Sequence, residues 1–337
     1  MRALRAVSKN EQQQKVLGQA LTQQGDLLFR QGKFDQALTR LEESLSILRP
    51  IGDPALLAGP LIFSSMVLQL TGEIDRAQPL MVEGLVNAQA AGDQWFTAYG
   101  LFNQGYLASL VGRYAEGYQQ MLAGIAGWRD LGDPRYTALG LNFISRTAMK
   151  LGRHAQAQAF LEESLNLCHQ VGDRWGMGTA YRYLGLAALI RGDPDEARSL
   201  INKSLDIFAG VTTGWDIVQS LVFLGEAAAL SGDASEARRI FLDALQQARK
   251  AQTALLAIEA LIGLAQLQAR AGEPDQALEL ALFVSNHPAS SQEAKDRAAQ
   301  LHGEIEANLS PAQIDFARQQ AQTKSIEALV EEILVVS

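Results

Sequence analysis

The residues of this chain that could do acid–base or metal chemistry are few. Its 337 residues include one cysteine, Cys168, and four histidines. The histidines stand in no H-E-x-x-H arrangement and beside no cysteine pair; they are His154, His169, His287 and His302. The sequence also lacks a G-x-S-x-G nucleophile turn and a G-x-x-x-x-G-K-[ST] phosphate loop. We therefore predict a protein that is not an enzyme and that holds no metal and no cofactor.

Two pairs of glutamates and a group of large residues are the remaining candidates. Glu42–Glu43 and Glu162–Glu163 each stand beside leucines that recur at helical spacing, which favours a solvated outer helix face over acid–base work. The stretch VGDRWGMGTAYRYLG at 171–185 instead sets Trp175, Tyr181 and Arg182 on a predicted helix. Whether these residues bind something depends on the helix face that they occupy.

A period of forty residues positions these side chains. Seven turn glycines follow one another at equal steps: Gly32, Gly72, Gly112, Gly152, Gly192, Gly232 and Gly272. Apolar and small residues recur on both sides of each glycine at helical spacing, so each repeat is predicted to be helix, tight turn, helix. Between repeats, Gly-Asp turns at Gly52, Gly92, Gly132 and Gly172 can end one helix and cap the next, whereas Thr212 and Gln252 replace that glycine later.

This pattern resembles the tetratricopeptide repeat. Small residues twelve positions apart carry the resemblance, as in the pairs Gly25 and Ala37, Gly105 and Gly117, and Gly185 and Ala197. The usual period is about 34 residues, and the extra residues here lengthen the helices and the turn between repeats. The resemblance implies an all-α, right-handed superhelical solenoid of seven helical hairpins, with an N-terminal helix and a C-terminal helical cap.

The forty-residue form also resembles a narrower group. The sequence LEESL at 41–45 and 161–165, followed by GDRWG, and the tail LSPAQIDFARQQAQTKSIEALVEEIL are similar to the C-terminal sensor arrays of STAND-class signal-transduction ATPases, which include ATP-dependent bacterial transcription regulators. The resemblance covers about residues 11–337. It implies residues 1–10 as the trailing helix of a truncated preceding repeat, 11–290 as seven repeats and 291–337 as the cap. It also implies a nucleotide-binding domain upstream in a longer chain.

One face of each first helix is the predicted binding surface. Positions 17, 13, 10, 6 and 3 before the turn glycine form a continuous stripe, and in tetratricopeptide arrays the matching face lines a concave groove. In repeats three to six this stripe supplies the candidate residues Trp95, Tyr99, Phe102, Tyr106, Arg135, Asn142, Arg146, Trp175, Arg182 and Trp215. Tyr181 is expected to pack inside.

Two interpretations of the stripe remain open. Trp95, Trp175 and Trp215 hold equivalent positions and could simply attach each helix to its neighbour. Aromatic and arginine side chains in a concavity are also typical of a recognition site, in which case the arginines favour an acidic ligand. Glu226 or another local acid could instead pair with one of these arginines.

Composition limits the partners. The net charge of −8 and the absence of a basic block argue against direct binding of nucleic acid. The longest apolar run, at 59–70, is too short and too interrupted to predict a membrane span, and a single cysteine suits the reducing cytoplasm. We predict a cytoplasmic sensor module that binds a protein, a peptide or a small-molecule effector in its groove. The alternative is a free-standing scaffold or adaptor.

Overall fold

The fold is an array of α-helices. The structure, a computed structural model, describes residues 2–210, 214–251, 254–307 and 309–336, among which no strand occurs. Seven hairpins follow one another: α1 (Arg2–Arg30) with α2 (Phe34–Leu48), α3 (Pro54–Thr71) with α4 (Ile74–Ala90), α5 (Gln94–Leu110) with α6 (Tyr114–Asp130), α7 (Pro134–Lys150) with α8 (His154–Val171), α9 (Arg174–Arg191) with α10 (Pro194–Phe208), α11 (Gly214–Leu230) with α12 (Ala234–Lys250), and α13 (Ala254–Arg270) with α14 (Pro274–Asn286). Three more helices complete the described chain: α15 (Gln292–Glu306), α16 (Pro311–Thr323) and α17 (Ile326–Val336). The predicted all-α repeat of hairpins is confirmed, while Thr212 and Gln252 lie outside the described residues.

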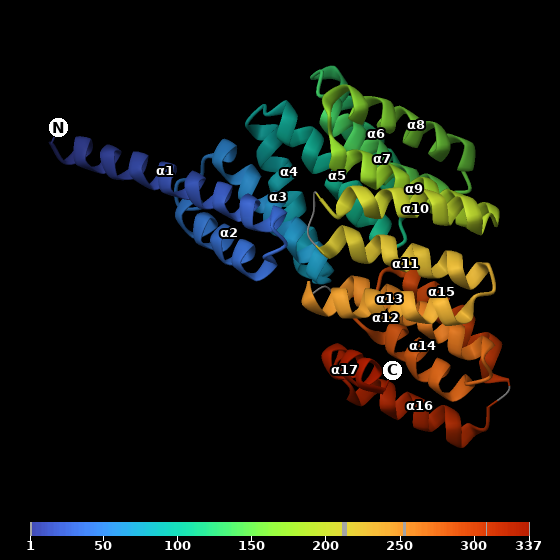
Figure 1. Ribbon diagram of the computed structural model, residues 1–337. Helices are drawn as coiled ribbons and strands as arrows, with labels where there is room; N and C mark the ends of the chain where they lie inside the picture. Colours follow the sequence, from blue (N-terminus) through green and yellow to red (C-terminus); the bar gives the residue numbers. More distant parts are fainter. Residues whose placement is uncertain (1, 211–213, 252–253, 308, 337) are drawn as a thin grey trace. The chain divides into compact units, whose positions relative to one another are not determined.

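The helices form two compact units. The first contains residues 1–109 and 113–140, and the second contains 110–112 and 141–337. Within each unit the two helices of a hairpin pack together, as α9 and α10 do in Figure 1, and hairpins stack on their sequence neighbours through contacts such as that of α10 with α11. In the second unit α15 packs on both α13 and α14. The cap is thus joined to the last repeat.

Helix α1 spans the predicted boundary between residues 10 and 11. It runs from Arg2 to Arg30 without a break, and no glycine or proline occurs before Gly18 to end a helix. The predicted divisions, 1–10, 11–290 and 291–337, stay predictions.

Glycine in the left-handed conformation closes the turns, as the sequence indicates. All seven turn glycines within hairpins have positive φ, between 71° at Gly152 and 88° at Gly72. Gly52, Gly92, Gly132 and Gly172 between repeats do as well, and each is followed by an aspartate whose carboxylate accepts a backbone N–H of the next helix. These short caps let identical turns recur every forty residues.

Gly152 provides a direct test of this requirement. Its φ is +71° and a Cβ there would meet no atom within 4 Å, so backbone conformation alone opposes a side chain. We expect Gly152→Val to lower the free energy of unfolding by about 1–2 kcal/mol. Gly303→Ala is the matched control, because this helical glycine also has open space but ordinary φ, and alanine should stabilise its helix by about 0.5–1 kcal/mol. Urea unfolding followed by circular dichroism measures both, and an unchanged midpoint for Gly152→Val would contradict the prediction.

Helix α3 is both long and strongly apolar. By length and composition alone it could cross a membrane, which the sequence analysis did not expect of this segment. In the structure 67% of its most apolar window is buried, and Leu61 and Ile62 have no exposed surface. Its composition is that of a core helix of the first unit.

Candidate functional site

Part of the predicted binding stripe is a packed aromatic cluster in the first unit. Trp95 stacks on Tyr99 with ring centres 5.0 Å apart, and Phe102 lies 5.2 Å from Trp128. Tyr99 and Phe102 are only 6% and 3% exposed. The Trp95 indole N–H donates at 3.2 Å to the carboxylate of Asp133, the residue that caps α7. Placing Tyr99 and Phe102 on an open groove was therefore wrong, because they fill the space between neighbouring helices.

Asn142 and Arg182, forty residues apart, are also buried, each with no exposed surface. The Asn142 amide donates to the backbone carbonyl of Gly176 at 3.0 Å. The Arg182 guanidinium donates to the carboxylate of Asp216 at 3.0 Å and, at 3.4 Å, to its backbone carbonyl. Both bonds reach the next first helix at the same separation of 34 residues, so this stripe position joins one repeat to the next. The prediction that these two residues face the groove is wrong.

Aromatic rings surround the Arg182 guanidinium. Its central carbon lies 5.1 Å from the ring centre of Tyr183, 5.3 Å from that of Phe208 and 6.0 Å from that of Trp215. Trp175 donates its indole N–H to the second carboxylate oxygen of Asp216 at 2.8 Å. Tyr181, expected inside, is instead partly exposed, with the Lys203 amine 5.8 Å from its ring. The helix is thus rotated relative to our prediction, and Arg182 takes the inner position.

The remaining stripe residues have different environments. Trp95, Tyr106, Trp175 and Trp215 are partly exposed, and Arg135 is exposed. Arg146 is the one predicted residue that lines the cavity of the second unit at which we place the candidate site. The structure therefore does not gather the ten predicted residues into one surface, and a binding role for those that reach solvent stays a prediction.

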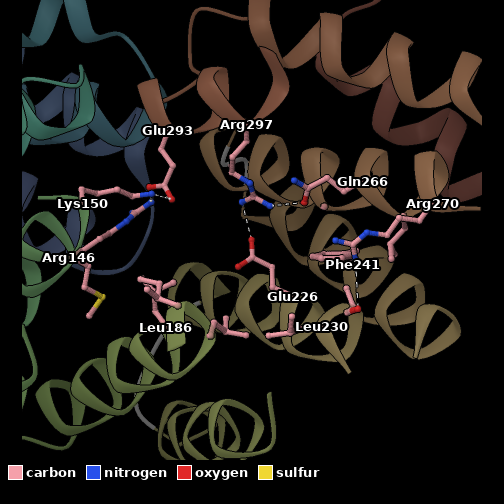
Figure 2. A pocket seen from close by; sticks show the side chains of 16 residues that line it. Arg146, Lys150, Leu186, Glu226, Leu230, Phe241, Gln266, Arg270, Glu293 and Arg297 are labelled. Atoms are coloured by element: carbon pink, nitrogen blue, oxygen red, sulfur yellow. Dashed lines mark hydrogen bonds and ion pairs between the residues drawn. The ribbon is translucent and has the colours of Figure 1, made fainter. Parts of the chain in front are cut away.

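That cavity lies at the C-terminal ends of the first helices of repeats four to seven. It has a volume of about 320 Å³ and is lined by side chains of α7, α9, α11, α12, α13 and the first turns of α15. Aliphatic side chains form much of its wall: Met149, Leu186, Leu189, Ile190, Leu230 and Leu267. Six charged side chains also line it: Arg146, Lys150, Glu226, Arg270, Glu293 and Arg297. Figure 2 shows Leu186 and Leu230 on one side and Glu293 and Arg297 reaching in from α15 on the other.

Two ion-pair groups connect α15 to the first helices. One Glu293 carboxylate oxygen lies 2.8 Å from the Arg146 guanidinium and the other lies 2.5 Å from the Lys150 amine (Figure 2). One turn later, Arg297 lies 2.8 Å from Glu226 and donates to the Gln266 amide oxygen at 2.9 Å. Glu293 and Arg297 therefore join α15 to α7 and α11 through opposite charges and to α13 through a hydrogen bond.

Burial and charge set the protonation states here. Burial alone would raise the pKa of Glu293, but Arg146 and Lys150 outweigh it and lower that pKa to about 2. The pKa of Glu259, 3.7 Å from Arg297, is raised by burial and then by the nearby carboxylates Glu293 and Glu226. Glu293 is therefore an anion at neutral pH, whereas ionisation of Glu259 is disfavoured.

The raised pKa of Glu259 should make the effect of Glu259→Gln on the melting temperature depend on pH. A carboxyl whose pKa is raised on folding loses stabilising free energy as pH rises through its folded-state pKa. Glutamine keeps an oxygen that can accept from the Ser291 hydroxyl, which donates to Glu259 at 3.2 Å. We expect the variant to have a higher melting temperature than the wild type at pH 8 and a smaller advantage at pH 4. Thermal unfolding across this range measures it, and an advantage that grows on acidification would refute the assignment.

Three further cavity residues follow the same period. Leu186, Glu226 and Gln266 stand forty, eighty and one hundred and twenty residues after Arg146. Leu186 and Glu226 lie on the predicted stripe in repeats five and six but are not among its candidate binding residues, and Gln266 holds the same position in repeat seven, which the prediction did not include. Glu293 and Arg297 belong to the cap, outside the period, and the sequence has no signal that brings them to α7 and α11. Two of the predicted arginines pair with an acid of the same chain, as one interpretation of the stripe allowed. Arg146 pairs with Glu293 and Arg182 with Asp216, while Glu226 pairs with Arg297.

The arrangement is suited to binding. Four cations and two carboxylates line the cavity, so an anionic group is favoured beside the aliphatic wall. Among the described residues no group of three or more His, Cys, Asp and Glu side chains could hold a metal ion.

Comparisons with known proteins agree with the hairpin architecture. Tetratricopeptide-repeat family models match residues 136–209 and, separately, 17–43, 218–242 and 258–282. No curated protein matches the chain significantly in sequence. Among solved structures, a Rap protein complexed with Competence and Sporulation Factor is 13% identical, with a TM-score of 0.67 over 95% of this chain and 99% of that one.

Another similar structure is NprR in complex with its cognate peptide NprX, which is 12% identical with a TM-score of 0.61 over 94% of this chain and 99% of that one. The apo form of the quorum sensor NprR from B. thuringiensis is 13% identical, with a TM-score of 0.57 over 95% and 88%. At these identities the likeness is one of fold. The observed hairpins and the family-model matches show that this chain contains tetratricopeptide repeats.

Proposed function

We propose that this protein is a non-catalytic recognition module that binds a peptide segment in the cavity of its second unit. One observation carries the proposal: an aliphatic wall that includes Leu186 and Leu230 lies beside an excess of cationic side chains. Such a cavity suits an aliphatic side chain followed by a carboxylate. Its volume of about 320 Å³ accommodates one or two side chains of a partner. The fold likeness to NprR, whose structure holds the peptide NprX, supports a peptide as the partner.

A displayed library of random peptides tests the proposal. The full chain serves as bait, and selected peptides are measured by fluorescence polarisation against two variants. Leu230→Glu places a carboxylate in the cavity, at a side chain that is 48% exposed and should tolerate it. Val171→Glu is the matched control, because Val171 is 42% exposed in the same unit but does not line the cavity.

The expected result is that Leu230→Glu weakens peptide binding about ten-fold or more, through repulsion and lost apolar contact, while Val171→Glu changes little. Selected sequences should pair an aliphatic residue with Asp or Glu. Peptides that bind both variants equally, or no enriched peptide at all, would contradict binding at this cavity.

The wider setting is also a proposal. The resemblance of the LEESL and GDRWG sequences supports a cytoplasmic sensor that reports to a nucleotide-binding domain upstream, and a small-molecule effector could serve the same role. The alternative remains a scaffold that joins proteins without switching them. Sequencing the gene in frame before Met1 distinguishes the two: a G-x-x-x-x-G-K-[ST] loop supports the sensor, and a stop codon supports the scaffold.

A further inference from the structure

The first turn of α15 enters the cavity although it lies outside the forty-residue repeat. Ser291 caps this helix by accepting the N–H of Ala294, which directs Glu293 toward α7, where Arg146 precedes it by 147 residues. The Glu293 side chain is 20% exposed, and Arg146 and Lys150 are 19% and 31% exposed. Solvent therefore reaches this ion-pair group, and a ligand can reach it as well.

The first turn of α15 is attached to its neighbours by weaker contacts than the rest of the helix. The buried stripe of the helix consists of Ala294, Ala298, Leu301 and Ile305. The two alanines near the start bury little apolar surface, whereas Leu301 and Ile305 anchor the other end. At its start α15 is held by the hydrogen bond from Ser291 to Glu259 and by partly exposed ion pairs, for which an anion from solvent can compete. A competing carboxylate can therefore replace Glu293 while α15 stays attached through its second half.

The α7 side of the contact requires an anion. Arg146 and Lys150 are four residues apart on one helix face, where two cations repel each other unless a negative charge lies between them. Glu293 supplies that charge with one oxygen to each cation. The aliphatic Met149 and Leu186 belong to the same cavity wall, so a carboxylate bound here can carry an apolar chain into the cavity.

We propose that Arg146 and Lys150 form the carboxylate subsite of the ligand cavity, and that Glu293 is its internal occupant, which the carboxylate of an incoming acidic ligand replaces. The inference rests on the proposed function, because it names the part of the ligand that this cavity recognises. Its test uses small carboxylates and needs no selected peptide. Failure of the peptide selection and failure of the subsite are therefore separate outcomes.

The experiment removes Glu293 and supplies carboxylates from solution. Thermal unfolding and calorimetry compare full-length wild type with Glu293→Ala, in sodium acetate, sodium hexanoate or sodium chloride at one ionic strength. Acetate should raise the melting temperature of Glu293→Ala more than chloride does, and more than it does for the wild type. Glu293→Gln, which keeps the shape of the side chain, replaces the alanine variant should that one fail to fold.

Two comparisons distinguish a ligand-binding subsite from a cation that has merely lost its ion-pair partner. Each methylene group that is buried strengthens binding about four-fold, so hexanoate should bind Glu293→Ala about ten-fold or more tightly than acetate does. Glu279→Ala is the matched control: its partner Lys324 is 19% exposed and Glu279 is 20% exposed, but Lys324 also pairs with Glu332 and Glu279 lines no described cavity. Hexanoate should have no advantage over acetate there.

Further substitutions identify the residues concerned. Adding Lys150→Met to Glu293→Ala should abolish the carboxylate effect, and the wild type should bind hexanoate about ten-fold more weakly than Glu293→Ala does. Equal binding by the wild type would show that Glu293 does not occupy the subsite. Acetate and hexanoate that act no differently from chloride on Glu293→Ala would overturn the proposal.

Discussion

Asp216→Ala is expected to lower the free energy of unfolding by about 3–5 kcal/mol, because it leaves the charge of Arg182 buried without its carboxylate. Arg182 has no exposed surface and the Asp216 side chain is 8% exposed, so water cannot replace the lost partner. The same substitution removes the acceptor of the Trp175 indole N–H. Two contacts between consecutive repeats are lost together.

A second variant distinguishes charge burial from a general loss of packing. Arg182→Met in combination with Asp216→Ala removes both charges and leaves a chain of similar length among the Tyr183, Phe208 and Trp215 rings. Such double replacements restore much of the stability that a single one removes. Urea unfolding of the two variants measures the difference. If the double variant is no more stable than Asp216→Ala, the charge is not the cause.

Exposure, more than distance, decides the size of this effect. The Arg146–Glu293 pair has a similar separation, 2.8 Å against 3.0 Å, but its side chains are 19% and 20% exposed. Breaking it should therefore cost less than the loss of Asp216, because solvent can reach the partner that remains. Arg182 is consequently a residue of the repeat interface, and Arg146 is the arginine whose replacement leaves the fold intact.

Gly105→Ala is expected to cost about 1–3 kcal/mol, since an added methyl group forces α5 and α6 apart. A Cβ at Gly105 would lie 2.5 Å from the carbonyl oxygen of Gly117 and 2.7 Å from the backbone nitrogen of Met121. Backbone atoms cannot turn aside as a side chain can. The two helices of this hairpin therefore approach closely only because both positions are glycine.

Gly100→Ala in the same helix is the matched control. Its Cβ would meet the ends of the Leu85 and Ile62 side chains at 3.1 and 3.4 Å, and side-chain ends can shift. Alanine also has the higher helix propensity, which offsets a small clash by about 0.5–1 kcal/mol. Chemical denaturation should find Gly100→Ala much more stable than Gly105→Ala. Equal stability of the two variants would mean that α5 and α6 can separate without cost.

Local sequence determined the repeated hairpin of this protein. The glycines at forty-residue steps adopt positive φ and so end a helix. The aspartate that follows each of the glycines Gly52 and Gly172 between repeats caps the next helix through atoms only two or three residues away. The pair Gly105 and Gly117, which carries part of the resemblance to the tetratricopeptide repeat, lies at a close contact of two helices. The Ser310-Pro311-Ala312-Gln313 capping box begins α16 as its residues indicate. All of these depend on neighbours along the chain or within one hairpin.

Tertiary structure decided which helix face meets solvent and what closes the cavity. The residues of the predicted stripe do not share one environment, because packing between repeats buries Asn142 and Arg182 and leaves Arg146 on the cavity. Each of these residue types is compatible with either environment, so the sequence alone has no preference between them. Glu293 pairs with Arg146, which lies 147 residues earlier in the chain, and no local sequence pattern predicts an ion pair between helices so far apart in sequence. The periodic sequence therefore determines the array, while its long-range contacts determine the site.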